Sequence, residues 1–177
     1  MEPFEILLTN NAVVTGLASL PSRDRAARPA TLPLILAIHG GTYSANYFFA
    51  DDRHSAVPLS SALGIPFLAI NRPGYRDSTP LPTVPEGSSY LQEEGKYLHN
   101  EIIPAIWKRY ASQLGVSSIV LLTHSNGTPG GIVSAALNAK SDSYPLVGLV
   151  IHGNSTEWNH ENLAGVHEAL KGKPETL

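Results

Sequence analysis

A serine that could attack a carbonyl lies near the middle of the sequence, between an apolar run and a helix-like segment. The run at residues 118–122 is typical of a strand, and the segment at residues 129–137 is typical of a helix. A hydroxyl at the apex of such a strand–turn–helix connection projects out of the sheet, and the amide of the next residue points toward the same spot. Ser125 could therefore attack a carbonyl while the Asn126 N–H stabilises the oxyanion.

The residues around Ser125 match the G-x-S-x-G pattern of a nucleophile elbow only in part. Gly127 is small enough to let the strand and the helix approach each other, but Thr123 stands at the position where glycine is usual. Considered alone, the motif also suits an ordinary connection between a strand and a helix. Side chains alternate along a strand, so we expect His124 to face away from the substrate and not to act as the base.

A second group that could stabilise an oxyanion follows an earlier apolar run, at residues 34–38. This run ends in the sequence His-Gly-Gly-Thr at residues 39–42. Two glycines at the carboxyl end of a strand let the backbone turn sharply and expose its amides, so Gly41 or Thr42 could supply a second donor. A tight turn without a ligand explains the same glycines equally well.

The elements that must position these residues alternate between strands and helices. This alternation predicts an α/β fold with a mainly parallel, doubly wound sheet, whose functional groups lie at the carboxyl ends of the strands. Ser125, the His-Gly-Gly sequence and the turn Asn-Arg-Pro-Gly-Tyr at residues 71–75 all follow such ends. The predicted strands are residues 34–38, 65–70, 118–122 and 146–151.

An N-terminal hairpin is expected before these units, because two asparagines separate the apolar runs at residues 4–8 and 12–17. The chain has 177 residues and is 42% hydrophobic, which is enough for one core. We interpret residues 1–177 as a single, partial domain in which residues 152–177 form an atypical tail.

A long helix is predicted between the second and third of these strands. Ser89 and Gln92 have the spacing of a capping box, apolar residues recur at helical intervals, and Gly115 is a suitable end. Pro104 could kink this helix. His99 falls among its polar positions and is predicted to lie on the surface.

The composition argues against several classes of protein. The formal net charge of -3 provides no basic field for nucleic acid, and the arginine-rich stretch at residues 23–28 is expected to be a solvated loop. No apolar run is long enough to span a bilayer, and the first residues lack the positive start of a signal peptide. We therefore expect a cytoplasmic protein with no nucleic-acid partner, no membrane span and no cofactor.

Taken together, the three strand ends resemble the N-terminal two-thirds of an α/β-hydrolase with a serine nucleophile, of the AB hydrolase-1 kind. The resemblance covers roughly residues 4–151. It is carried by the strand that ends in His-Gly-Gly, the strand that ends in Asn-Arg-Pro-Gly-Tyr, and the sequence Thr-His-Ser-Asn-Gly at residues 123–127. The order and spacing of the three are more specific than any one of them.

We call the turns at the carboxyl ends of the strands the rim, and the resemblance implies a role for each rim residue. Ser125 is the nucleophile, the amides of Asn126 and of Gly41 or Thr42 form the oxyanion hole, and His39 braces the oxyanion turn. A serine nucleophile implies acyl cleavage of a small ester-like substrate, as in esterases, lipases and thioesterases, and no metal.

The acid and base of the triad are harder to place. In the family they follow the serine in the chain and usually lie after strands beyond residues 146–151. Only 52 residues (177 − 125) follow Ser125. Glu157 is a candidate acid, and His160 and His167 follow too closely to return easily to the serine. We therefore expect a C-terminally truncated hydrolase that lacks the last strands and the cap, with an incomplete triad.

Two further expectations follow from the missing strands. A serine without a base is a weak nucleophile, so a catalytically impaired or non-catalytic hydrolase-like protein that binds a small ligand or a partner is the alternative function. The apolar strand at residues 146–151 would also lie at the edge of the sheet, where it invites pairing with another chain.

Overall fold

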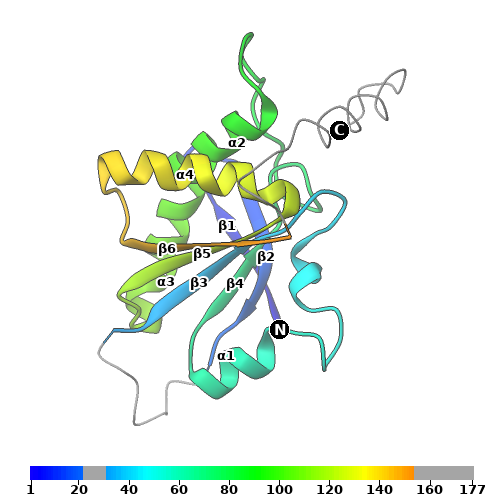
Figure 1. The fold of residues 1–177 in the computed structure, drawn as a ribbon, viewed down its shortest axis with the longest axis vertical. Coiled ribbons are helices and arrows are strands. Elements are labelled where there is room, and N and C mark those ends of the chain that lie inside the picture. The colour runs from blue at the N-terminus through cyan, green and yellow to red at the C-terminus, as the bar shows by residue number, and fades with distance from the viewer. Residues whose placement is uncertain (22–30, 154–177) are drawn as a thin grey trace.

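The computed structural model describes residues 1–21 and 31–153, which form one six-stranded sheet with helices on both faces (Figure 1). The strands are β1 (Glu2–Leu7), β2 (Val13–Ser19), β3 (Pro33–Ile38), β4 (Phe67–Ile70), β5 (Ser118–His124) and β6 (Leu146–His152). The helices are α1 (Val57–Leu63), α2 (Tyr90–Tyr97), α3 (Ile103–Leu114) and α4 (Thr128–Ser141).

The sheet has the strand order β1-β2-β4-β3-β5-β6. β1 and β2 form the predicted hairpin, β2 runs antiparallel to β4, and the remaining neighbours are parallel. These pairings confirm the predicted α/β class. β4 begins at Phe67, two residues later than predicted, because Pro66 has no N–H to give to the ladder.

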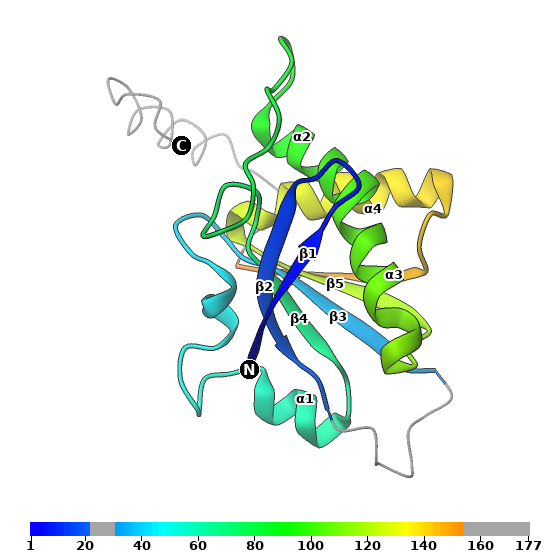
Figure 2. The same ribbon diagram turned by 180° about the vertical axis from the view of Figure 1, so that it is seen from behind.

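The two faces of the sheet are covered to different extents. Helices α2, α3 and α4 pack on one face, whereas α1 and a short helical turn at Ala45–Phe48 lie on the other (Figures 1 and 2). The side chains of β5 differ in burial in the same way. Ile119 and Leu121 point to the first face and are fully buried. Val120 and Leu122 point to the second face and are only half-buried.

The predicted long helix is present, but it contains a π-helical turn. Ser89 Oγ accepts a hydrogen bond from the Gln92 N–H at 3.2 Å and begins α2, and Gly115 ends α3 in the left-handed conformation at φ 65°. The π-helical turn at Leu98–Ile102 joins the two helices, and Pro104 follows it in the first turn of α3.

The predicted surface position of His99 is wrong. The ring is buried, with Nδ1 3.2 Å from the Tyr144 hydroxyl and Nε2 3.3 Å from Ser141 Oγ. His99 lies in the π-helical turn and is buried together with Leu98 and Ile102. Its polar partners Tyr144 and Ser141 come from a distant part of the chain, so they could not be anticipated from the helix alone.

A buried ion pair joins the carboxyl end of β4 to α2. Arg72 donates from Nε and Nη2 to the two carboxylate oxygens of Glu94, each at 2.7 Å. The two side chains are 3% and 0% exposed. Paired, charge-assisted hydrogen bonds impose a definite geometry, so the turn after β4 is held in place by the helix above it.

His39 joins the turns that follow β3 and β4. Its Nε2 lies 3.1 Å from the Arg72 backbone N–H, which can only donate, so Nε2 is the acceptor and Nδ1 carries the hydrogen. Nδ1 therefore donates to the Gly40 carbonyl at 2.8 Å. Burial is the main cause that lowers the pKa of His39 to about 4. These contacts confirm that His39 braces the turn after β3.

The ion pair leads to a prediction about stability. Substituting Glu94→Ala leaves the Arg72 charge buried without its partner, so the free energy of unfolding should fall by about 3 kcal/mol. Glu93→Ala is the matched control, because Glu93 belongs to a partly exposed pair with Lys96 on the same helix. Urea denaturation of the variants checks this, and equal losses for both would contradict it.

The neutral state of His39 leads to a prediction about pH. Its folded-state pKa of about 4 lies below the 6.5 of an ordinary histidine, so protons bind the unfolded chain preferentially between these values. The contribution of His39 to stability should be complete above about pH 6.5 and fall by up to about 3 kcal/mol as the pH drops to 4.

Urea denaturation of the wild type and of His39→Asn across this pH range measures that contribution. The other titratable groups contribute to both proteins, so the difference between the two profiles isolates His39. The Asn variant should show the shallower pH dependence, and profiles of equal slope would contradict the prediction.

Candidate active site

Ser125 lies in the predicted turn between β5 and α4. One short helical turn, Ser125–Gly127, connects the strand to the helix, and Pro129 lies in the first turn of α4. Ser125 has a φ of 47°, a left-handed conformation that non-glycine residues rarely adopt. Strand, strained serine and helix are the local geometry that a nucleophile elbow requires.

The turns that follow β3 and β5 come into contact through glycines. A Cβ atom added to Gly40 would lie 2.9 Å from the Ser125 Cβ, and one added to Gly41 would lie 2.7 Å from the Asn126 Nδ2. A side chain at Gly40 would displace the turn that holds Ser125, and one at Gly41 would displace the Asn126 side chain. The structure thus brings Gly41, Ser125 and Asn126 together, and Thr42 follows directly.

The departure from the motif at Thr123 is accommodated inside α4. Thr123 is fully buried, and its hydroxyl donates to the Val150 carbonyl at 3.2 Å. Its methyl group occupies the space beside Gly131, where any Cβ would collide with it. Gly127 remains necessary, because a Cβ there would lie 2.5 Å from the His39 carbonyl oxygen. The usual small residue before the serine is replaced by a glycine in the following helix.

Backbone strain gathers in the three turns that follow β3, β4 and β5. Thr42, Arg76 and Ser125 have φ values of 63°, 50° and 47°. For a β-branched residue such as Thr42, positive φ is a true outlier. The other non-glycine residues with positive φ in the described part of the chain are Asn11 and Asp142, in a hairpin and at a helix end, where these residue types are tolerated.

The ring of His124 belongs to an aromatic cluster. It stacks on Tyr47 with 4.2 Å between ring centroids and 11° between planes. Its Nδ1 lies 3.0 Å from the Nδ1 of His152, at the end of β6. Burial is the main cause that lowers the pKa of His124. The ring therefore fills the space between β6 and the segment after β3.

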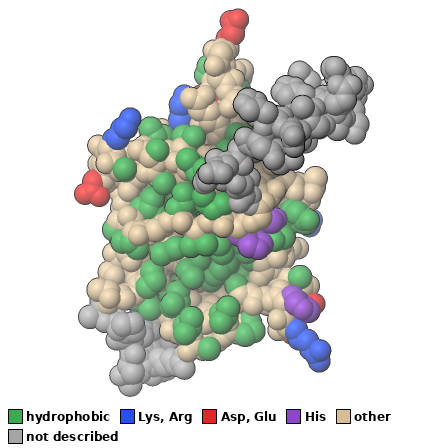
Figure 3. Space-filling model, in the orientation of Figure 1, with side chains coloured by type: hydrophobic (Ala, Val, Ile, Leu, Met, Phe, Trp, Pro, Cys, Tyr) green, Lys and Arg blue, Asp and Glu red, His purple; other side chains and the backbone are tan. Residues whose placement is uncertain are grey.

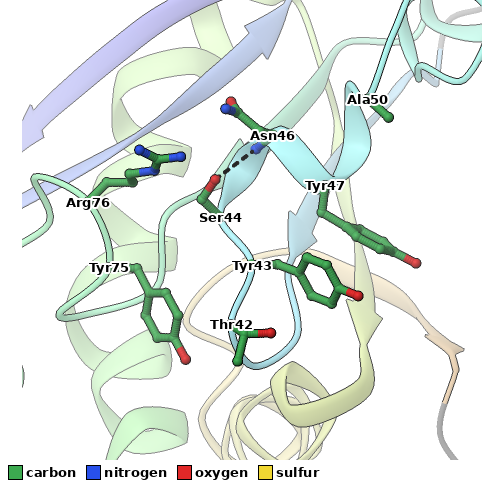
Figure 4. Close-up of a pocket in the computed structure, with 8 residues that line it drawn as sticks. All are labelled: Thr42, Tyr43, Ser44, Asn46, Tyr47, Ala50, Tyr75 and Arg76. Carbon is green, nitrogen blue, oxygen red and sulfur yellow. Dashed lines mark hydrogen bonds between the residues drawn. The ribbon is translucent and has the colours of Figure 1, made fainter.

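A cavity of about 610 Å³ opens between the turns that follow β3 and β4 (Figure 4). The ring of Tyr75 packs edge-on against His39, with 4.7 Å between centroids, and Tyr47 stacks on His124. Two tyrosines of the cavity wall therefore pack against His39 and His124, which adjoin the turns that follow β3 and β5. Its lining residues are Thr42, Tyr43, Ser44, Asn46, Tyr47, Ala50, Tyr75 and Arg76.

Sequence reasoning did not identify this cavity. The available signal was the placement of Tyr43, Tyr47 and Tyr75, each within ten residues of a predicted strand end. Isolated tyrosines are common in loops, so this signal becomes informative only when the topology places β3 beside β4.

Several predicted features lie beyond what the structure describes. Glu157, His160 and His167 fall outside residues 1–21 and 31–153, so the acid and base of the triad stay predictions. Within those two ranges, no three His, Cys, Asp or Glu side chains are grouped as a metal site would need. Nor does any helix there have the length and apolar character needed to cross a membrane.

Comparison with known proteins finds similarity in structure only. No family model matches the sequence, and no curated protein matches it. A mutant of the Vigna radiata epoxide hydrolase matches 97% of this chain at 14% identity with a TM-score of 0.58, and the Aspergillus niger epoxide hydrolase matches 94% at 15% identity with a TM-score of 0.55. Brefeldin A esterase, a bacterial homologue of human hormone-sensitive lipase, matches 93% at 20% identity with a TM-score of 0.53.

The chain spans 45%, 39% and 43% of these three structures, less than half of each. All three are hydrolases, and their common architecture extends over nearly the whole of the present chain. The strand order, the strained turn at Ser125 and these similarities together lead to one conclusion: the chain has the α/β-hydrolase fold.

Proposed function

We propose that this chain is a serine-dependent acyl hydrolase of the esterase, lipase or thioesterase kind, acting on a small ester-like substrate. The observation that carries the proposal is the φ of 47° at Ser125, between β5 and α4. Strain of this kind persists where the surroundings enforce it, and it is common at reacting groups. The turn projects the serine from the carboxyl end of the sheet, where ligands bind in open α/β folds.

The neighbouring turn supports this role. The amide of Asn126 and that of Gly41 or Thr42 are the proposed oxyanion donors, and Gly41 lies against the Asn126 side chain. In the first step, Ser125 Oγ bonds to the substrate carbonyl carbon, its proton passes to a base, and the carbonyl oxygen becomes an oxyanion. The alcohol then leaves with a proton, and water releases the acyl group from the serine.

The identity of the nucleophile favours esters over epoxides. Two of the structural neighbours named above are epoxide hydrolases, and one is an esterase. A serine forms an acyl intermediate that suits ester, thioester or amide cleavage, whereas epoxide opening in this fold relies on an aspartate nucleophile. With Ser125 as the proposed nucleophile, this chain is expected to cleave esters.

The alternative is a non-catalytic protein that binds a ligand at the same rim. It is favoured by the difficulty of completing the triad, since Glu157 is the candidate acid, His160 and His167 are weak candidate bases, and none of them is assigned. This alternative predicts saturable binding without turnover.

A fluorophosphonate probe distinguishes the two functions. The probe reacts with activated serines, so the folded wild type should be labelled and should hydrolyse 4-nitrophenyl acetate, and Ser125→Ala should lose both properties. Ser141→Ala is the matched control, because Ser141 is an exposed serine at the other end of α4. Circular dichroism establishes that each variant is folded. An unlabelled, folded wild type would exclude the hydrolase.

Self-association through the edge strand is a second part of the proposal. β6 is the last strand of the sheet that residues 1–21 and 31–153 form, and residues 146–151 contain no charged side chain and no proline that would discourage pairing. Val147 and Val150 are 67% and 48% exposed. Hydrophobic side chains lie on both sides of the strand, with no charged ones among them (Figure 3). A second copy meets no like-charge repulsion there and can pair β6 with β6 across a two-fold axis.

Sedimentation across a range of concentrations tests this pairing. The wild type should dimerise, and Val147→Lys should remain monomeric, because a lysine on an edge strand opposes pairing. Leu59→Lys is the matched control, since Leu59 is 66% exposed on α1 and lies away from β6. A monomeric wild type at all concentrations, or equal effects of the two lysines, would contradict the pairing.

A further inference from the structure

The cavity between the turns after β3 and β4 has an unbalanced charge. Arg76 is the only charged side chain in its lining, which is otherwise formed by tyrosines, small polar residues and an alanine. The chain as a whole has a net charge of -3, so a positive lining is not a general property of this surface. An anionic ligand would meet no carboxylate within the cavity walls.

The three tyrosines of the cavity are supported by other aromatic or charged groups. Tyr75 packs against His39, and the Arg72 guanidinium lies 5.3 Å from the centre of the Tyr75 ring. Tyr47 stacks on His124, and Tyr43 lies 5.0 Å from Tyr47 between centroids. Supported rings lose little conformational entropy on binding and provide flat apolar surfaces that favour planar groups.

Arg76 lines the same cavity as these rings and has a φ of 50°. Its guanidinium is directed toward Ser44 on the opposite wall (Figure 4). Among residues 1–21 and 31–153, none of the ion pairs includes Arg76. Glu5 and Asp77 line a neighbouring cavity that shares Ser44, Asn46 and Arg76 with this one. The tyrosine-lined cavity has no carboxylate in its lining, so an anion is favoured there.

Thr42 connects this cavity to the proposed reaction. It lines the cavity and is also a candidate oxyanion donor, one residue after the glycine that contacts Asn126. An ester whose carbonyl lies at the oxyanion donors can extend one of its substituents along this wall. The cavity is thus positioned as a subsite for part of the substrate and not as an isolated surface feature.

We propose that this cavity binds a planar, carboxylate-bearing group, so that the substrate is an anionic ester with an aromatic or similarly flat end. That this group is part of the substrate rests on the proposed function, whereas the binding of the anionic group does not. The tyrosine rings hold the flat part, and Arg76 pairs with the carboxylate.

Binding is measured first, without turnover, by titrating the Ser125→Ala protein with phenylacetate and with its neutral match, phenylacetamide, in an NMR experiment. Phenylacetate should bind about fivefold more tightly at low salt, the size expected of a solvent-exposed charge pair, and added salt should reduce the difference. Arg76→Gln should abolish the preference, and Arg76→Lys should retain part of it.

Arg53→Gln is the matched control for charge, because Arg53 is exposed and does not line the cavity. It should keep the preference for phenylacetate. Equal binding of the acid and the amide, or an equal loss in the Arg53 and Arg76 variants, would overturn the proposal.

Hydrolysis separates this inference from the proposed function. The wild type should cleave mono(4-nitrophenyl) terephthalate, whose acyl group is flat and carries a carboxylate, with a higher kcat/KM than 4-nitrophenyl 4-methylbenzoate, and Arg76→Gln should reduce that ratio about fivefold. A preference for phenylacetate in binding without any hydrolysis would contradict the proposed hydrolase and support the anion-binding subsite. Hydrolysis of both esters with the same kcat/KM would retain the hydrolase and overturn the subsite.

Discussion

The turns that follow β3 and β5 touch each other, and the rest of the rim depends on that contact. Gly40 meets Ser125 at a distance that leaves no room for a side chain. The turn that contains Gly40 is fixed by His39, which accepts a hydrogen bond from the backbone of Arg72. The side chain of Arg72 is in turn held by Glu94 of α2. A series of buried polar contacts therefore runs from α2 through Arg72 and His39 to Gly40, and the close contact between Gly40 and Ser125 links this series to the proposed nucleophile.

Local strain at this rim is sustained by the same contacts. Residues held at positive φ without being glycine cost on the order of 1 to 3 kcal/mol each, and Thr42, Arg76 and Ser125 all belong to this class. His39 supports two of these strained positions. It anchors the turn that leads to Thr42, and its ring packs against Tyr75, the neighbour of Arg76. The strain at these residues lowers the stability of the fold, and it fixes their orientation. All three strained residues lie in turns that follow the carboxyl ends of parallel strands.

The strand framework could be predicted from the sequence because buried parallel strands require uninterrupted apolar runs, and the four predicted runs all became strands. The turns at Gly41 and Ser125 could also be located, because glycines after such runs allow the backbone to turn sharply. A serine at the same place is typical of a connection between a strand and a helix. Features that depend on two distant segments could not. The accommodation of Thr123 by Gly131 requires knowledge of how α4 lies on β5. The burial of His99 involves the distant residues Tyr144 and Ser141, and the tyrosine cavity exists only once β3 and β4 are neighbours. Sequence patterns report local periodicity, whereas these features arise from packing between elements.

β6 is both the edge of the sheet and a direct support of the nucleophile strand. Thr123 donates to the Val150 carbonyl, and His124 contacts His152 at the end of β6. Strands in a sheet are about 4.8 Å apart, so a strand added to the outer edge of β6 would lie about 10 Å from β5. Pairing across a two-fold axis is antiparallel, so the loop before the added strand lies at the carboxyl end of β6 and the loop after it lies at the far end. The strand whose edge is proposed for self-association is thus also the strand that holds Thr123 and His124 beside Ser125, so pairing at β6 and the geometry of the Ser125 turn are coupled.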